Sequence, residues 1–549
     1  MVLSKKGDNI KLTHQLNYKM RERDLKSHNI EHIVFYVVLI LNMLPAVLFK
    51  FFPTMDGPAH LYNSNLLNEL LFRPHTSIGD YYILNPILVP NLLSHMILSL
   101  INLFFPAFWA EKILIVSYLF LLPVSFRSLT KFYNKESLSY LIFPFCYSGL
   151  FYLGFYNLSM SFILLFYTLL FWKKNENKLH IKSSFFLFLL VTTTYFAHIF
   201  TFIFLVLTLM FDILLSWCSG IAHKKNNIQL HVHKFLFIVI ATIPAMVLLF
   251  VFISNTNFEA SQMTLPTSEL IKWIKDVRPL IALGYEQELR FTEIYYHVLI
   301  VLSTIIFFVK VQDYKSKYQK SIFSLTLFKR LNYSKNLYLF MSIIILLLYL
   351  IVPNSSSAGM MSDRLCLIFF LYAITWIAIA NFPSWLRNFS IIAILYVNFG
   401  LVLRYIKATN ELNDTAIAIN EASHKIKSYA TVLPINNSNE WLQPHFSNYL
   451  GIDKPLIILE NYEASVGWFA VKWNESDFPI LKLGDLYNTD CSYAWKSGEK
   501  KIEKKIDYIF VWGKDKEISY DAHEQLQKYY KLIYLSPDEK IKLYELNVK

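Results

Sequence analysis

Apolar residues dominate most of the chain and occur in runs that polar segments separate. A bilayer-spanning helix needs about 20 largely apolar residues, with roughly 17 to 25 tolerated. Eleven runs meet or approach this length, so the pattern predicts a polytopic α-helical membrane protein. The predicted spans lie near residues 32–51, 109–126, 138–154, 156–172, 184–198, 200–217, 235–253, 294–309, 337–352, 365–380 and 389–405.

One further apolar run, NLLSHMILSLINLFF at 91–105, is shorter than most of the others. Pro86 and Pro90 precede it, and His95 and Asn102 interrupt it. A run of this length favours an interfacial or re-entrant helix over a membrane span. We therefore predict that 91–105 lies at the membrane surface.

The pattern changes after residue 405. Polar and charged residues become frequent there, and apolar residues form short runs such as PLIILE (455–460) and IDYIFVWG (506–513). Runs of this length between helical stretches predict strands. We expect residues 406–549 to form a small soluble α/β domain, in which the sequence places no glycine-rich phosphate loop.

Composition agrees with this membrane assignment. Of the 549 residues, 55% are hydrophobic and 17% aromatic, and there are 14 glycines. A soluble domain of this length has a different composition. The four cysteines are scattered along the chain, so we expect neither a disulfide framework nor a cysteine-rich metal site.

The formal net charge of +12 indicates topology. Basic residues concentrate in short loops between the apolar runs, where the positive-inside rule places them on the cytoplasmic side. We therefore expect no nucleic acid partner. The basic loops are 127–137, 173–182, 223–234 and 310–336, and they share this side with a basic tail at 1–31 that carries seven Lys or Arg between Lys5 and Lys26.

This arrangement predicts a cytoplasmic N-terminus and an extracytoplasmic C-terminal domain. The tail has no apolar core, so the first apolar run is a retained span and not a cleavable signal. Residues 32–405 then form the transmembrane domain, with large outer loops at 52–108 and 254–293. Functional residues are expected at the outer face.

A carboxylate follows directly on the first apolar run, in FPTMDGPAHLYN at 52–63. An ionisable side chain at membrane depth costs about 2.5 kcal/mol or more, so such a residue is functional by default. Asp56 could instead cap the helix that Gly57 and Pro58 begin. However, His60 and Asn63 follow within two helical turns, which is more than a cap needs.

In layout the chain resembles the GT-C superfamily of glycosyltransferases, which includes protein O-mannosyltransferases and lipid A aminoarabinose transferases. The resemblance rests on MDGPAHLYN at 55–63, on its position after the first span, on the interfacial helix and on the outward C-terminal domain. It implies that Asp56 is the catalytic carboxylate. Because His60 follows Asp56 so closely, we also place His60 in the predicted catalytic site, where it would orient the acceptor or the carboxylate. The resemblance also implies that the donor is a polyprenyl-phosphate sugar.

The sequence departs from the family at one point. Many members carry a second acidic residue beside the first or in the next outer turn. Here Gly57 follows Asp56, and the turn YLGFYNLS (152–159) offers only Asn157. We therefore predict no metal ion and no cofactor.

A lone carboxylate can still support the chemistry, because the polyprenyl phosphate is already a good leaving group. The enzyme must hold an acceptor hydroxyl against the anomeric carbon and accept its proton, which is general-base work for Asp56. Attack opposite the phosphate inverts the anomeric centre. A cation or hydrogen-bond donor must also hold the phosphate.

Candidate phosphate ligands lie at the outer ends of predicted spans. Arg364, in MMSDRLCLIFF, can grip a phosphate with two parallel hydrogen bonds, although it could instead snorkel or pair with Asp363. His198, in TTTYFAHIF, is either a donor to the phosphate or a packed polar residue.

Four weaker candidates complete the predicted donor and substrate site. Asn63 and Asn157 can bind sugar hydroxyls, and for Asn157 the favoured alternative is a hydrogen bond between helices. Arg278 and Lys275 lie in the amphipathic segment IKWIKDVRPL (271–280), which is typical of a membrane-lying helix that admits an anionic head group.

Together these features predict an inverting glycosyltransferase of the cytoplasmic membrane with its site on the outer face. Its partners would be a polyprenyl-phosphate-linked sugar, membrane lipids and an acceptor that is a protein, lipid or glycan. Two alternatives stay open. One is a transporter or flippase for a lipid-linked sugar, although no repeated halves are visible. The other is a non-catalytic GT-C-like scaffold for cell-envelope assembly.

Overall fold

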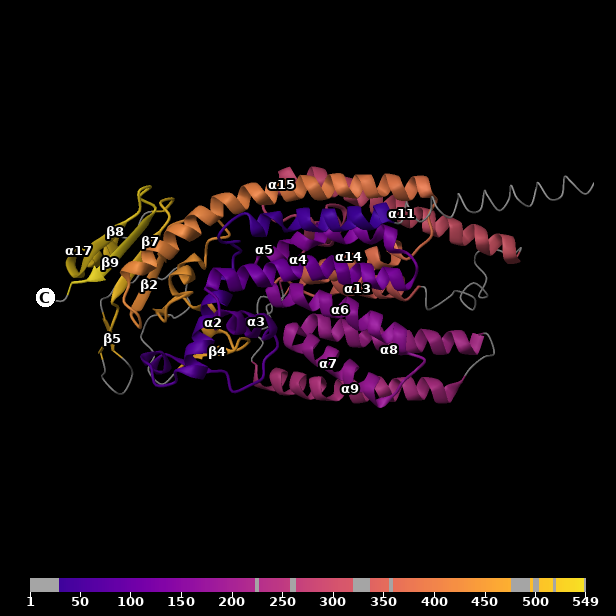
Figure 1. Cartoon of the computed structure of the whole chain (residues 1–549), viewed down its shortest axis with the longest axis horizontal. Helices are drawn as coiled ribbons and strands as arrows, with labels where there is room; N and C mark the ends of the chain where they lie inside the picture. The colour runs from indigo at the N-terminus through magenta and orange to yellow at the C-terminus, as the bar shows by residue number, and fades with distance from the viewer. Residues whose placement is uncertain are drawn as a thin grey trace, which may run out of the picture.

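The computed structural model describes residues 29–222, 227–256, 263–318, 336–354, 359–474, 494–496, 503–516 and 520–547. The predicted basic tail, up to residue 28, lies outside the described residues, as do most of the predicted basic loop 310–336 and part of the loop 223–234. In the described part, long helices lie side by side, and a small sheet projects beyond one end of them (Figure 1).

Seven of the described helices are long and apolar enough to cross a membrane, so the chain is a multi-pass membrane protein. Each contains or overlaps a predicted span. They are Asn29–Val47, α4 (Ala107–Phe132), α8 (Ile199–Ala222), α9 (Ile228–Asn255), α11 (Tyr285–Tyr318), α14 (Met361–Ala378) and α15 (Ser384–Ala422).

Three more predicted spans are helices that are shorter or less apolar. These are α6 (Tyr156–Asn175), α7 (Ile181–Ala197) and α13 (Leu337–Ile351). Helices α7 and α13 have 17 and 15 residues, below the length of a typical span. In α6, polar residues at the first turn and two lysines at the last turn lower the hydropathy.

The structure differs from the prediction at 138–154. Instead of a regular α-helix, the chain forms the 3-10 helix η2 (Glu136–Tyr147) and then the short helix α5 (Gly149–Tyr152). Pro144 lies inside η2 and has no backbone N–H to donate to an α-helical hydrogen bond. A 3-10 helix rises about 2.0 Å per residue, so η2 reaches about 24 Å, most of the thickness of a bilayer core of about 30 Å.

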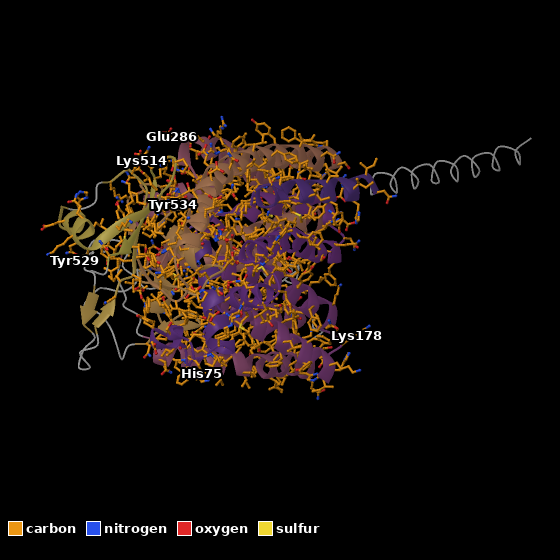
Figure 2. All side chains as sticks on the ribbon, turned by 60° about the vertical axis from the view of Figure 1, so that its left-hand side comes forward. His75, Lys178, Glu286, Lys514, Tyr529 and Tyr534 are labelled. Atoms are coloured by element: carbon orange, nitrogen blue, oxygen red, sulfur yellow. The ribbon has the colours of Figure 1, made fainter. Side chains whose placement is uncertain are left out.

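The helix bundle has two chemically different ends. At one end, which we call the basic end, Lys173 bonds to Asp212 (Nζ to Oδ1, 2.6 Å) and Arg127 to Glu31. The predicted outer segments meet at the other end, which we call the site end, where Leu92 N–H donates to the Phe196 carbonyl at 2.8 Å. Figure 2 shows Lys178 and Lys514 at opposite ends of the molecule.

The first loop of the site end contains two helices. Helix α2 (Gly57–Phe72) packs on α3 (Leu93–Asn102), which lies within the run that was predicted to be interfacial. With 10 residues, α3 is about 15 Å long and too short to cross a bilayer core of about 30 Å.

The C-terminal region forms a mixed five-stranded sheet in the order β3-β2-β7-β9-β8. Strands β3 and β7 lie in the two runs that predicted strands, so this part of the prediction is confirmed. Strand β2 pairs in parallel with β3 and β7, and β9 pairs antiparallel with β7 and β8. The strands are β2 (Thr431–Asn436), β3 (Ile457–Ile458), β7 (Tyr508–Trp512), β8 (Tyr530–Leu535) and β9 (Ile541–Leu546).

The sheet is tied to the membrane helices in two ways. Helix α15 runs without a break through residue 405, where the predicted domain boundary lies, and ends beside the sheet (Figure 1). Strand β1 (Tyr82–Leu84) of the first loop pairs antiparallel with β4 (Val471–Trp473) of the C-terminal region. The first loop and the C-terminal region therefore form one structure at the site end.

Candidate functional site

Asp56 lies at the junction between the first membrane helix and α2. Its backbone N–H donates to the Leu153 carbonyl at 3.1 Å, so the turn after α5 fixes its position. Pro58 follows in the first turn of α2, where its missing N–H costs no helical hydrogen bond. Asp56 occupies the N-cap position, yet its side chain makes no capping hydrogen bond. Its carboxylate is buried and faces other side chains.

Two glycines let the backbone close around Asp56. A Cβ at Gly154, whose φ is +89°, would lie 2.8 Å from both the Cβ and the backbone N of Asp56. A Cβ at Gly57 would lie 2.4 Å from Thr54 Oγ1 and 2.5 Å from the hydroxyl of Tyr156. Position 57 therefore has no room for the second acidic residue that many GT-C enzymes carry there.

The Asp56 carboxylate faces a histidine from the C-terminal region. Asp56 Oδ1 lies 3.6 Å from Nε2 of His445, and Nδ1 of His445 bonds to the Glu460 carboxylate. Ser447 Oγ and Asn448 Nδ2 donate to Oε2 of Glu460 at 2.6 and 2.9 Å. Glu460 thus orients the imidazole toward Asp56.

Burial and charge act in opposite directions on these two groups. Burial raises the pKa of Asp56 above its usual 3.8, although the nearby His445 and His60 oppose this rise. Burial by itself would lower the pKa of His445, but the negative charges of Glu460 and Asp56 outweigh it and raise that pKa. The pair can therefore hold and exchange a proton inside the protein.

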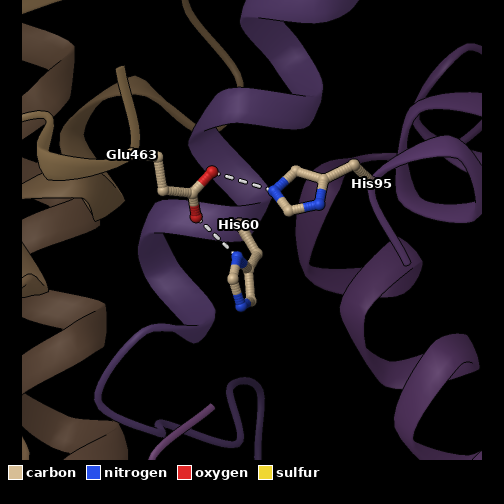
Figure 3. Close-up of side chains that lie close together, drawn as sticks. All are labelled: His60, His95 and Glu463. Atoms are coloured by element: carbon tan, nitrogen blue, oxygen red, sulfur yellow. Dashed lines mark hydrogen bonds and ion pairs between the residues drawn. The ribbon is translucent and has the colours of Figure 1, made fainter. Parts of the chain in front are cut away.

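A second cluster joins α2, α3 and the short helix α16 (Tyr462–Ser465). His60 Nδ1 lies 2.5 Å from Oε1 of Glu463, and His95 Nε2 lies 2.8 Å from Oε2 of the same carboxylate (Figure 3). His60 Nε2 also donates to the Gly154 carbonyl at 2.9 Å. Burial opposes the ionised form of Glu463, but His95 and His60 outweigh it and lower its pKa to about 2.

A third buried network lies on the other side of the Asp56 turn. Tyr156 donates its hydroxyl hydrogen to Oε1 of Glu111 at 3.0 Å, and Thr54 Oγ1 lies 2.9 Å from the same hydroxyl. Thr54 Oγ1 in turn accepts from the N–H of Gly57 at 3.1 Å. The threonine, and not Asp56, thus caps the start of α2.

The predicted phosphate ligands lie next to this turn. The Arg364 guanidinium stacks on the rings of Phe155 and Phe200, with its Cζ 5.0 and 5.6 Å from their centroids. Its Nε is buried and makes no hydrogen bond to the described residues. Nδ1 of His198 accepts from the N–H of Phe200 at 3.2 Å, which leaves Nε2 as the protonated nitrogen. Both side chains are therefore hydrogen-bond donors beside Phe200.

The two predicted asparagines make hydrogen bonds within the protein. The amides of Asn63 and Asn461 bond reciprocally at 2.9 Å in both directions. Asn157 accepts from the N–H of Ser94 at 2.8 Å and donates to the Asn91 carbonyl at 2.7 Å. Both amides connect separate segments in this structure.

Arg278 and Lys275 lie apart from Asp56, near the amphipathic helix α10 (Thr267–Lys275). The guanidinium of Arg278 lies 3.4 Å from the Asp363 carboxylate (Nε to Oδ1) and stacks over the ring of Trp273. Lys275 is exposed in the last turn of α10.

Sequence reasoning missed most of the acidic and histidine residues that surround Asp56. His95 was noted only as an interruption of an apolar run. No local signal distinguishes the others from surface residues, because their partners lie far away in the sequence. The missed residues are His95, His445, Glu460 and Glu463. Glu111, at the start of the predicted span 109–126, was expected to pair with Lys112, whereas it accepts from Tyr156.

Comparison with known proteins gives a match in fold. No protein-family model matches the chain, and no curated protein matches it in sequence. The crystal structure of ArnT from Cupriavidus metallidurans in the apo state aligns over 94% of this chain and 98% of that one, with a TM-score of 0.51 and 8% identity. The structure of ArnT bound to undecaprenyl phosphate aligns over 93% and 97%, with a TM-score of 0.48 and 8% identity.

The apo-state alignment confirms the resemblance at the level of the fold. ArnT is a lipid A aminoarabinose transferase of the GT-C superfamily. The chain thus has a GT-C-like arrangement of membrane helices followed by a C-terminal α/β region.

Proposed function

We propose that this chain is an inverting glycosyltransferase that uses a polyprenyl-phosphate sugar as its donor. One observation carries the proposal. At the site end of a GT-C-like fold, a buried carboxylate makes no capping bond and faces an imidazole 3.6 Å away. A buried ionisable pair of this kind, at the end of a membrane bundle, indicates proton transfer.

In the proposed reaction, Asp56 is the general base. The acceptor hydroxyl oxygen forms a bond to the anomeric carbon while the bond from that carbon to the phosphate oxygen breaks. The hydroxyl proton passes to the Asp56 carboxylate, and the electron pair of the broken bond leaves with the polyprenyl phosphate. Because attack and departure occur on opposite faces, the anomeric configuration inverts.

His445 supports this role. Its positive charge favours the ionised form of Asp56, which the reaction requires, against the effect of burial. Glu460 holds the imidazole in place, since it binds the other ring nitrogen. We assign His445 as a positioning and charge-stabilising residue for Asp56.

Arg364 and His198 are the proposed phosphate ligands. Arg364 has a buried Nε without a hydrogen bond to the described residues, and its guanidinium lies over the rings of Phe155 and Phe200. A planar cation held in this way suits a phosphate oxygen pair. His198 adds a neutral donor through Nε2.

The proposed orientation follows from charge. Three described basic residues of the predicted basic loops, Arg127, Lys173 and Lys234, lie at the basic end of the bundle, and basic loops remain in the cytoplasm. The site and the C-terminal region would therefore face outward from the cytoplasmic membrane. The acceptor would be a protein, lipid or glycan of that compartment.

The test is turnover by purified protein in lipid vesicles. A panel of undecaprenyl-phosphate sugars is supplied with envelope lipids, glycans and proteins as acceptors, and release of undecaprenyl phosphate is measured by mass spectrometry. We expect release with one sugar class and an anomeric configuration in the product opposite to that of the donor, read from its NMR coupling constant.

Two results would contradict the proposal. Transfer of intact donor between the leaflets without release of undecaprenyl phosphate would identify a flippase. Binding of envelope components without consumption or movement of any donor would identify a scaffold.

A further inference from the structure

The cluster formed by His60, His95 and Glu463 has the donor set of a transition-metal site. Two imidazole nitrogens and a carboxylate are the protein ligands of many zinc enzymes and of related sites for other first-row metals. The ligand atoms of the three residues all lie within 4.8 Å of one another. All three side chains are buried, with 3% of His60, 1% of His95 and none of Glu463 exposed.

Hydrogen-bond accounting at His60 leaves one place between its ring and Glu463 that either a proton or a metal ion can fill. Nε2 of His60 faces the Gly154 carbonyl oxygen at 2.9 Å, and a carbonyl only accepts, so Nε2 carries the hydrogen. In a neutral imidazole, Nδ1 then carries no hydrogen and is an acceptor, yet it lies 2.5 Å from a carboxylate oxygen of Glu463. Two acceptors face each other at this distance only if a proton or a metal ion lies between or beside them.

The surroundings of His60 match those of a metal ligand. Metal-bound histidines almost always donate their second N–H to a backbone carbonyl, a carboxylate or a water, which fixes the tautomer and the ring orientation. In this cluster, the Gly154 carbonyl accepts the second N–H of His60. On the other side, the ring of Phe469 packs against both imidazoles, with centroids 5.9 Å from His60 and 5.4 Å from His95.

The present distances are those of hydrogen-bonded pairs, which a bound metal would widen. Zinc binds nitrogen and oxygen at about 2.0 to 2.2 Å, so tetrahedral ligands lie about 3.4 Å apart. Two of the contacts in the cluster, at 2.5 and 2.8 Å, are already shorter than this separation. Small rotations of the side chains would open these contacts and bring the two imidazole nitrogens together around an ion.

We propose that His60 Nδ1, His95 Nε2 and the Glu463 carboxylate bind a divalent transition metal ion, and we assign this ion as zinc. The ion would connect α2 and α3 of the first loop to α16 of the C-terminal region. This inference differs from the sequence-based expectation of no metal. It does not depend on the proposed transfer activity, because metal binding is measured without donor or acceptor.

The test measures metal content and affinity in full-length protein that has no polyhistidine tag. The protein is treated with a chelator, loaded with zinc, desalted and analysed by mass spectrometry for metal, and affinity is measured by competition with a zinc indicator. We expect the zinc content of wild-type protein to exceed that of the His95→Ala variant by one ion per chain. We expect His95→Ala and Glu463→Gln to bind zinc at least about 100-fold more weakly.

His198→Ala is the matched control, because His198 is a buried histidine of the same end of the bundle without an acidic partner among the described residues. It should retain the zinc of the wild type. His95→Cys covers the case in which alanine prevents folding, since a thiolate also binds zinc and cobalt. With cobalt, it should show a thiolate-to-metal charge-transfer band that wild-type protein lacks.

Equal zinc content in wild-type protein and in folded His95→Ala would overturn the inference and identify the cluster as an ion pair held by protons. Absence of the charge-transfer band in cobalt-treated His95→Cys would have the same meaning. Loss of zinc in His198→Ala would show that the metal lies elsewhere.

Discussion

The Asp56 carboxylate lies 3.6 Å from the His445 imidazole, although one residue follows the first membrane helix and the other follows the last. The fold brings them together because α15 leads directly from the membrane to the C-terminal sheet. The carboxylate thus has a charged partner that the first outer loop itself does not contain. The proposed reaction depends on this pair, and the first two of the following predictions test it.

Replacement of Asp56 by asparagine should lower transfer by roughly 100-fold or more, the usual range for loss of a general base. The variant should melt no lower than wild type at neutral pH. Burial raises the pKa of Asp56, so its ionised form costs folding free energy above that pKa, and asparagine removes this cost. Donor turnover and a thermal melt in detergent measure the two effects. Wild-type turnover in a folded Asp56→Asn protein would exclude Asp56 as the general base.

The acidic limb of the pH profile should depend on His445. Transfer needs ionised Asp56, so activity falls as pH falls through the pKa of that carboxylate. Burial raises this pKa, while the charge of His445 lowers it. In His445→Gln the opposing charge is gone, so the pKa rises further and the acidic limb moves to higher pH. A profile of kcat/KM against pH checks the direction, and a limb that stays in place would remove His445 from this role.

Replacement of Arg364 by alanine should weaken donor binding strongly, because the phosphate loses a planar, charged donor. Lysine should restore only part of the affinity, since it keeps the charge but loses the second hydrogen bond. His198→Ala should have a smaller effect, as a neutral donor contributes less. Binding is measured with a labelled polyprenyl phosphate. Lys178→Ala, at an exposed lysine of the basic end, is the control for loss of a positive charge.

The Asn63 and Asn461 amides should behave as a structural pair. Each single change to alanine leaves a buried amide without its partner, which costs about 1 to 3 kcal/mol of folding free energy. The double variant should lose less than the sum of the two, because no unpaired amide remains. Thermal melts of the four proteins give the coupling. Additive losses, or an effect on sugar binding without an effect on stability, would instead favour a substrate contact for Asn63.

Membrane orientation can be tested at two exposed lysines on opposite ends of the molecule, Lys514 and Lys178 (Figure 2). In a background without native cysteines, Lys514→Cys should react with an impermeant thiol reagent in intact cells. Lys178→Cys should react only after the membrane is permeabilised, because its loop belongs to the basic end. The reverse labelling pattern would place the site in the cytoplasm.

The lengths of the apolar runs predicted the helices and strands that depend on local sequence. Long apolar runs became helices, and the runs at 455–460 and 506–513 contain strands β3 and β7. The run at 138–154 is apolar enough for a span, but Pro144 falls within it, and the chain there adopts a 3-10 helix. Hydropathy measures the environment of such a segment and not its helical type.

Of the candidate site, the sequence predicted mainly the residue whose position next to a membrane helix is unusual for its charge. Asp56 stands out because a carboxylate next to a membrane helix is costly. Glu463 and Glu460 lie in a region with many charged residues, where acidic side chains are normally solvated. Their burial arises from pairing with His60, His95 and His445, and such pairing depends on the tertiary fold.

The pairing of β1 with β4 also sets the order in which the protein can be completed. Ribosomes deliver Asp56 and His60 early, while Glu463 and the strand Val471–Trp473 emerge only after every membrane helix has been made. Until then, a nascent chain contains His60 without its partner Glu463, and β1 without its partner strand β4. A chain that ends before residue 463 would therefore lack both of these contacts between the first loop and the C-terminal region, even if every membrane helix had been made.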